Sequence, residues 1–144
     1  YPIETGNFKL DGGAMFGVVP KSIWNRTNPA DANNMIDLAA RCLLIENGDR
    51  LILIDNGLGN KQSEKFFSYY YLWGDHTLDK SLESAGFHRD DITDVFLTHL
   101  HFDHCGGRKT ALGTSLPLKM HVSGRIKITG NGQPSPMLGK KRHF

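Results

Sequence analysis

The order of apolar and polar residues along the chain predicts strands first and a strand-helix-strand passage afterwards. The run from Leu51 to Ile54 is apolar at every position, which predicts a strand buried on both faces. It follows the turn Asn47-Gly48-Asp49, a composition typical of a hairpin. We predict strands at 13–19, 39–46, 50–55 and 92–97, and helices at 66–73 and 77–85, the second ended by Gly86. This order favours an α/β (α+β) fold, a mixed sheet with helices on one face.

One segment, directly after the predicted strand 92–97, concentrates the reactive side chains. It is T-H-L-H-F-D-H-C-G-G, from Thr98 to Gly107. In an extended chain, residues two apart point the same way, so His99 and His101 can bind one metal ion. Asp103 continues the alternation, and His104 can turn toward a second ion. We therefore predict that the metal ligands are His99, His101, Asp103 and His104, and a histidine-rich surface loop is the alternative.

Two metal ions a few ångströms apart lower the pKa of a shared water and hold the oxygen that it attacks. This chemistry favours hydrolysis of an ester, lactone, amide or phosphoester. Asp103 is then the catalytic residue, because it both binds a metal and orients the attacking water. Gly106 and Gly107 allow the backbone to turn and to approach a neighbour closely. We expect Cys105 and Cys42 to be small buried side chains rather than ligands.

The H-x-H-x-D-H motif of this segment resembles the signature loop of the metallo-β-lactamase superfamily. The segment L-I-L-I-D-N-G-L-G at 51–59 resembles the strand and turn that place an acidic residue beneath that loop. A weaker resemblance, G-G-A-M-F-G-V-V-P at 12–20, is to the lactonase-like and organophosphate-hydrolase-like members. The resemblance covers 1–107 and implies the N-terminal half of an αββα sandwich with two zinc ions. Asp55 is interpreted as the residue that orients a ligating imidazole, with an ordinary turn aspartate as the alternative.

The same resemblance implies that some ligands are missing. Members of the superfamily take a later histidine, a bridging aspartate and a final histidine from a second half of similar length. His121 and His143 lie downstream, but neither has a G-H-T-x-G-H context. A catalytic zinc usually has three protein ligands, so we expect one or no zinc ion in this chain and impaired activity from a truncated enzyme.

The aromatic segment from Phe66 to Trp73 has two interpretations. It can line a substrate pocket, or it can be a helix that buries an apolar face on the sheet.

The charge distribution divides the chain at residue 107. All 15 Asp and Glu lie in 1–107, whereas 108–144 carries 8 of the 17 Lys and Arg and no acid. We interpret 1–107 as the half domain and 108–144 as a basic tail outside the family. A charged arm for nucleic acid or a membrane surface, a disordered segment and an out-of-frame translation product are the alternatives.

Three functions follow from these observations. We prefer a zinc-dependent hydrolase that acts on a small ester, lactone or phosphotriester through metal-bound hydroxide. The second is a noncatalytic metal-binding or interaction fragment. A nucleic-acid binder is the least favoured because no binding motif accompanies the basic charge, and no apolar run is long enough to cross a membrane. We expect homo-oligomers through the exposed sheet face and slightly favour a cytoplasmic location, although the start at Tyr1 leaves an upstream signal peptide as an alternative.

Overall fold

A computed structural model of the protein describes residues 1–108 and the backbone of 120–122. Its elements are, in order, β1 (Pro2–Asp11), α1 (Gly12–Phe16), α2 (Lys21–Trp24), β2 (Met35–Asn47), β3 (Arg50–Ile54), α3 (Glu64–Ser68), α4 (Leu78–Ser84), the 3-10 helix η1 (Arg89–Asp91), β4 (Asp94–Leu97), α5 (Phe102–Cys105), the 3-10 helix η2 (Gly106–Arg108) and β5 (Met120–Val122). The strands form one sheet in the order β1-β2-β3-β4-β5.

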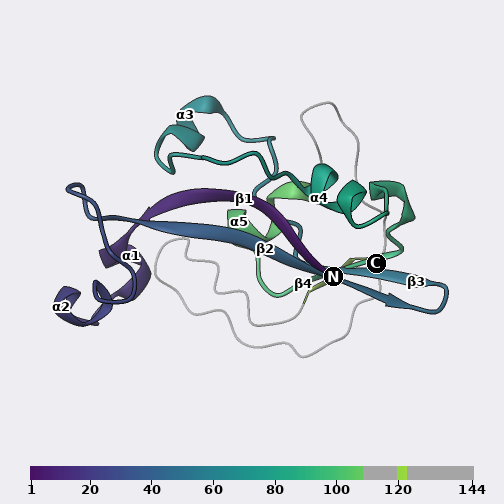
Figure 1. Ribbon diagram of the computed structural model, residues 1–144, viewed down its shortest axis with the longest axis horizontal. Coiled ribbons are helices and arrows are strands. Elements are labelled where there is room, and N and C mark those ends of the chain that lie inside the picture. The colour runs from purple at the N-terminus through teal and green to yellow at the C-terminus, as the bar shows by residue number, and fades with distance from the viewer. Residues whose placement is uncertain (109–119, 123–144) are drawn as a thin grey trace, which may run out of the picture.

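The sheet is mixed, as predicted. β1, β2 and β3 pair antiparallel, whereas β3, β4 and β5 pair parallel. The chain between β3 and β4 crosses over through α3 and α4, which lie on the same side of the sheet (Figure 1). This parallel crossover brings the carboxyl ends of β3 and β4 to one edge, the position at which α/β sheets collect functional residues.

The predicted hairpin is confirmed as β2 and β3. Its turn includes Gly48, whose φ of 58° is a left-handed conformation that glycine adopts without strain. The expectation of burial on both faces holds for one face only. Leu51 and Leu53 are buried against α4, whereas Ile52 and Ile54 are half-buried.

The core lies between the sheet and α4. Alternate residues of the strands point to one face, and α4 covers them with Leu78 and Leu82. The buried cluster consists of Ile3, Cys42, Leu44, Leu51, Leu53, Leu78, Leu82, Ile92, Val95 and Leu97. Burial of each leucine or isoleucine stabilises the fold by about 1.5–3 kcal/mol, so this layer holds the ends of β3 and β4 in place.

The prediction of a strand at 13–19 is wrong, because helix α1 begins this segment. The carboxylate of Asp11 accepts a hydrogen bond from the backbone N–H of Ala14 at 2.8 Å, a typical helix N-cap. The first long strand, β1, was not expected. A bulge between Glu4 and Gly6 shifts its register, which breaks the alternation of apolar and polar residues that would have indicated it.

The helices after β3 are shorter than predicted. The helix expected at 66–73 ends at Ser68, and Tyr71 then has a φ of 45°. The following residues run beside β1, where the backbone of Trp73 pairs with Asn7. The helix expected at 77–85 is confirmed as α4. In the described part of the chain no helix is long and apolar enough to cross a membrane.

Strand β5 belongs to the basic segment 108–144. Its backbone pairs with β4, with Met120 opposite Val95 and Val122 opposite Leu97. The boundary at residue 107, a disordered tail and an out-of-frame origin stay predictions.

Candidate metal centre

The histidine-rich segment leaves the sheet at Thr98, directly after β4, and closes into the short helix α5. The structure brings the four predicted ligands close to one another in two pairs. The imidazole Nε2 of His99 lies 3.1 Å from Nδ1 of His101, and the rings of His99 and His104 are 4.0 Å apart between centroids. Nε2 of His104 lies 3.3 Å from a carboxylate oxygen of Asp103.

Asp55 follows β3 and lies beneath this loop. It is only 6% exposed, and its oxygens accept hydrogen bonds from the backbone N–H of Thr98 at 2.8 Å and the Thr98 hydroxyl at 2.8 Å. Nδ1 of His104 lies 2.7 Å from Oδ2 of Asp55, the oxygen that also accepts the 2.8 Å hydrogen bond from the Thr98 hydroxyl. The predicted contact between Asp55 and an imidazole is therefore confirmed. The turn interpretation also holds, because Asp55 has a φ of 58°, a left-handed conformation uncommon outside glycine.

The other end of the loop is bound to the turn after β3 by its backbone. The Asn56 N–H donates to the carbonyl of His104, and the Asn56 side-chain oxygen accepts from the Gly107 N–H, each at 2.8 Å. The guanidinium of the buried Arg89 donates to the Gly107 carbonyl at 2.9 Å. A Cβ at Gly106 would lie 1.8 Å from the carbonyl oxygen of Leu58. The close approach predicted for the two glycines is confirmed, and Arg89 is an anchor that no sequence pattern indicated.

The loop environment favours uncharged imidazole at His99. Burial lowers the pKa of His99, and the neighbouring His104 and His101 lower it further because like charges repel. Neutral imidazole is the form that binds metal. Burial raises the pKa of the Cys105 thiol, which packs against the core, and raises that of Cys42 to about 12. Both thiols are thus protonated. Cys42 is buried, as predicted, whereas Cys105 is only half-buried at the margin of the core.

The donor set has the chemistry and spacing of zinc ligands. Zinc–nitrogen and zinc–oxygen distances of 2.0–2.2 Å at a tetrahedral angle place neighbouring ligand atoms about 3.3 Å apart. The His99–His101 and Asp103–His104 atom pairs, at 3.1 and 3.3 Å, match this separation. Each pair provides two donors, and among the residues that the structure describes no group of three or more His, Cys, Asp or Glu could hold an ion. The side chain of His121 and the whole of His143 lie outside the described residues.

Part of the aromatic segment packs beside the histidine-rich loop, and its role as the lining of a substrate pocket stays a prediction. Phe102, inside the motif, lies 4.3 Å from Tyr70 and 5.3 Å from Phe66 between ring centroids. Phe102 is the first residue of α5, so these ring contacts join α5 to the aromatic segment. Tyr69 and Trp73 are 62% and 50% exposed, so the rest of the segment covers no core.

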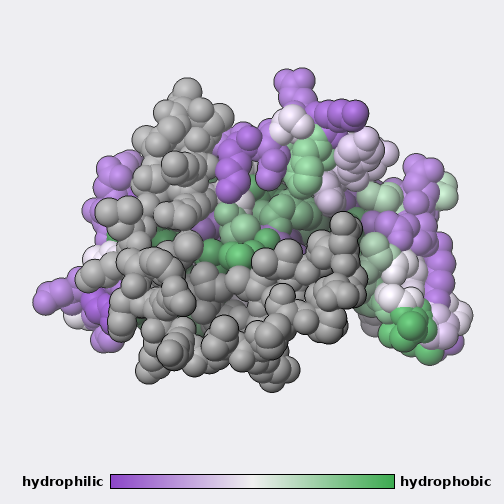
Figure 2. All heavy atoms as spheres, turned by 180° about the vertical axis from the view of Figure 1, so that it is seen from behind, coloured by the Kyte–Doolittle hydropathy of each residue, from purple (hydrophilic) through white to green (hydrophobic). Residues whose placement is uncertain are grey.

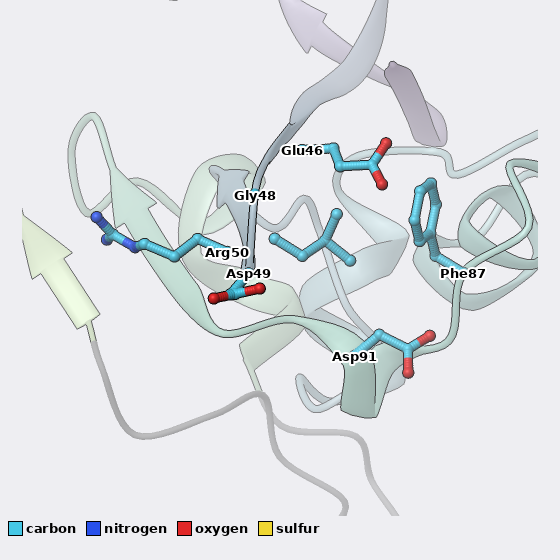
Figure 3. A pocket seen from close by; sticks show the side chains of 7 residues that line it. Glu46, Gly48, Asp49, Arg50, Phe87 and Asp91 are labelled. Atoms are coloured by element: carbon cyan, nitrogen blue, oxygen red, sulfur yellow. The ribbon is translucent and has the colours of Figure 1, made fainter.

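A hollow of about 260 Å³ lies beside the turn of the β2–β3 hairpin, at the end of β3 that is far from the histidine-rich loop. Glu46, Asp49, Arg50, Phe87 and Asp91 line it beside the β2–β3 turn (Figure 3). β3 begins at Arg50 and reaches the metal loop only after Ile54, so this hollow is separate from the candidate metal centre.

A mixed sheet with an H-x-H-x-D-H loop at the end of a parallel strand, above a buried aspartate, defines a class of metallohydrolases. The sequence profile of the metallo-beta-lactamase superfamily matches residues 35–114, more than half of the chain. The chain belongs to this superfamily.

Solved structures and a curated relative agree with this assignment. A probable metal-dependent hydrolase from Staphylococcus aureus superimposes with a TM-score of 0.76 and 34% identity, covering 85% of this chain and 44% of that one. AidC, a dizinc quorum-quenching lactonase in complex with a product, gives a TM-score of 0.58 and 28% identity, covering 84% and 39%. An N-acyl homoserine lactonase from Bacillus sp is 26% identical over 92 residues, 57% of this chain and 37% of that protein. The chain spans less than half the length of each.

Proposed function

We propose that the loop after β4 binds zinc and that the chain derives from a hydrolase of lactones, esters or phosphotriesters. The spacing of the two donor pairs carries this proposal, because each pair has the separation of neighbouring ligands on one ion. The lactonases among the relatives support a small-molecule lactone as the substrate class. The dizinc relative supports two ions.

Each side chain of the loop has a distinct role in this proposal. His99 and His101 hold one ion, and Asp103 and His104 hold the other. Bound zinc supplies Lewis acidity toward the substrate oxygen and lowers the pKa of the attacking water. Asp103 would also accept a hydrogen bond from the attacking water and so orient it toward the substrate. Asp55 holds the ring of His104 through the 2.7 Å contact with Nδ1.

A noncatalytic metal-binding fragment is the second candidate function. The observation that favours it is that each donor pair has two members in the described residues, whereas catalytic zinc usually has three protein ligands. On this basis we expect weak zinc binding and slow turnover from the 144-residue chain. Lactonase turnover that depends on zinc, is retained in a monomer and is lost in Asp103→Ala would exclude the fragment.

Replacement of His101 and His104 by Ala tests the proposed site. One donor is lost from each pair, so zinc uptake should be abolished when measured by competition with a chromophoric chelator. His76→Ala is the matched control, because it removes an exposed histidine outside the loop. Hydrolysis of an N-acyl homoserine lactone and a phosphotriester is followed in the same preparations. Unchanged zinc stoichiometry in the double variant would show that zinc binds elsewhere.

We also propose that the chain self-associates through the sheet face opposite α4. Leu43 and Ile45 of β2 are 46% and 38% exposed, and they pair with the half-buried Ile54 and Ile52 of β3. A contiguous apolar stripe of this kind favours contact between chains.

A further inference from the structure

The hydroxyl of Thr98 lies between the buried carboxylate and two imidazoles. Its Oγ1 is 2.8 and 3.0 Å from the two oxygens of Asp55 and 3.0 Å from Nδ1 of His99. It is 3.5 Å from Nδ1 of His104, which has the shorter contact of 2.7 Å with Asp55. The Thr98 backbone N–H also donates to Asp55, so the side chain is held at the centre of this group.

The donors and acceptors around Thr98 determine where its hydrogen points. A hydroxyl has one hydrogen to donate and two lone pairs that accept, whereas a carboxylate only accepts. The hydroxyl hydrogen therefore points at Asp55, and a lone pair of Oγ1 faces Nδ1 of His99. For this 3.0 Å contact to be a hydrogen bond, Nδ1 of His99 must carry the ring hydrogen.

The same argument places a hydrogen on Nδ1 of His104, because this nitrogen faces the acceptor Asp55. Nε2 of His104 faces a carboxylate oxygen of Asp103, which also only accepts, so the contacts assign a lone pair on Nε2 to His99 alone. Nε2 of His99 faces Nδ1 of His101, the partner atom of its donor pair. The ring nitrogen of His99 that faces its partner is thus the one without a hydrogen. The ring nitrogen opposite a hydrogen-bonded N–H is the one free to bind metal.

We propose that Thr98 is a positioning residue that holds His99 as the Nδ1–H tautomer. One buried carboxylate thus orients both rings, His104 directly and His99 through the Thr98 hydroxyl. The expected effect of this tautomer on zinc affinity rests on the proposed function, whereas the tautomer of His99 can be measured in the zinc-free chain. A merely structural Thr98 would support the loop backbone without determining which nitrogen of His99 carries hydrogen.

Thr98→Val and Thr98→Ser separate these roles. Valine keeps the shape and the backbone N–H but removes the hydroxyl, and serine retains the hydroxyl. Thr93→Val is the matched control, because the Thr93 hydroxyl contacts Leu51 and Asp94 near the start of β4 rather than a histidine. Long-range ¹H–¹⁵N NMR of the zinc-free full chain, at a pH where the imidazoles are uncharged, reports the tautomer. Chelator competition reports zinc affinity, and urea unfolding reports stability.

We expect Nδ1–H at His99 in the wild type, in Thr98→Ser and in Thr93→Val, and a shift toward Nε2–H in Thr98→Val. Zinc affinity should fall about 10-fold to 100-fold in Thr98→Val and return in Thr98→Ser, the usual effect of losing a partner of a metal ligand. Nε2–H at His99 in the wild type overturns the proposal even if Thr98→Val does not fold, and so does an unchanged tautomer in Thr98→Val. A tautomer shift in a chain that binds no zinc supports the role of Thr98 and refutes the proposed function.

Discussion

At the scale of single residues, the candidate centre depends on two glycines, at positions where a side chain would collide with a neighbouring backbone. The backbone of the loop meets the turn after β3 at Gly106 and Gly107, where the Gly107 N–H lies 3.1 Å from the carbonyl of Gly57. Asp55 occupies a left-handed conformation in the same turn. An aspartate tolerates this conformation at a cost of about 1–2 kcal/mol, which three donor groups hydrogen-bonded to its side chain, two on Thr98 and one on His104, offset.

Gly106→Ala should destabilise the chain by about 1–3 kcal/mol, because the new Cβ would meet the Leu58 carbonyl and the backbone would have to shift. Gly48→Ala is the control. Its φ is left-handed but nothing lies within 4 Å of the added Cβ, so the cost there should be about 1 kcal/mol. Urea unfolding measures both. A smaller loss in Gly106→Ala than in Gly48→Ala would mean that the loop is not seated as described.

At the scale of elements, β4 is the strand that carries the site, and ion pairs lie near both of its ends. At its start, the Arg50 guanidinium donates two hydrogen bonds to the buried Asp94, at 2.8 and 3.1 Å. Beyond its end, Arg89 joins Asp79 of α4 to the Gly107 carbonyl, at 2.7 and 2.9 Å. The second link connects the helix layer directly to the metal loop.

Arg89→Met should loosen the loop and leave the sheet intact. The buried Gly107 carbonyl loses its charged donor, which costs about 1–3 kcal/mol. Native-state hydrogen exchange should show faster exchange at the Asn56 and Gly107 amides, which bridge the loop and the turn. Arg50→Met is the matched control at the far end of β4 and should leave these two amides protected. Equal exchange in the two variants would refute a specific role for Arg89 at the loop.

At the scale of the whole molecule, the sheet has one face covered by α4 and another that carries the exposed Leu43 and Ile45. Figure 2, seen from the side opposite to Figure 1, shows hydrophobic side chains in the middle of the view and at its lower right, and hydrophilic ones along much of the margin. The chain matches less than half the length of its relatives. An apolar face of this kind makes association with a second chain favourable.

Ile45→Lys should therefore shift the chain toward the monomer in sedimentation velocity experiments over a range of concentrations. A lysine in the centre of the stripe would have to be desolvated in any contact through this face. Glu46→Lys makes a control next to it, because the neighbouring residue of a strand points to the opposite face. A wild-type chain that stays monomeric at high concentration would contradict the proposal. So would an equal effect of the two substitutions.

The sequence by itself determined those features that depend on neighbouring residues. The hairpin of β2 and β3 follows from two apolar runs around a turn, and α4 follows from its periodicity and from Thr77, which caps it. The histidine motif is also local, because alternation along an extended chain places His99 and His101 together. The closeness of these two side chains could thus be predicted without a fold, and their role as ligands stays a proposal.

Only the tertiary structure decided the features that join distant parts of the chain. The bulge in β1 disrupts the alternation that would have predicted this strand. The N-cap formed by Asp11 favours helix α1 in a segment whose sequence resembles a strand. The contacts of Asp55 with Thr98 and His104 span more than forty residues, as does the bond between Asn56 and Gly107. Of these, only the contact of Asp55 with an imidazole was predicted, and that prediction came from the family resemblance rather than from the local pattern. Such contacts depend on the parallel pairing of β3 with β4, which brings their carboxyl ends to one edge of the sheet. The local sequence does not predict which strands pair, because the pairing of β3 with β4 is stabilised by a core that the whole sheet and α4 form together.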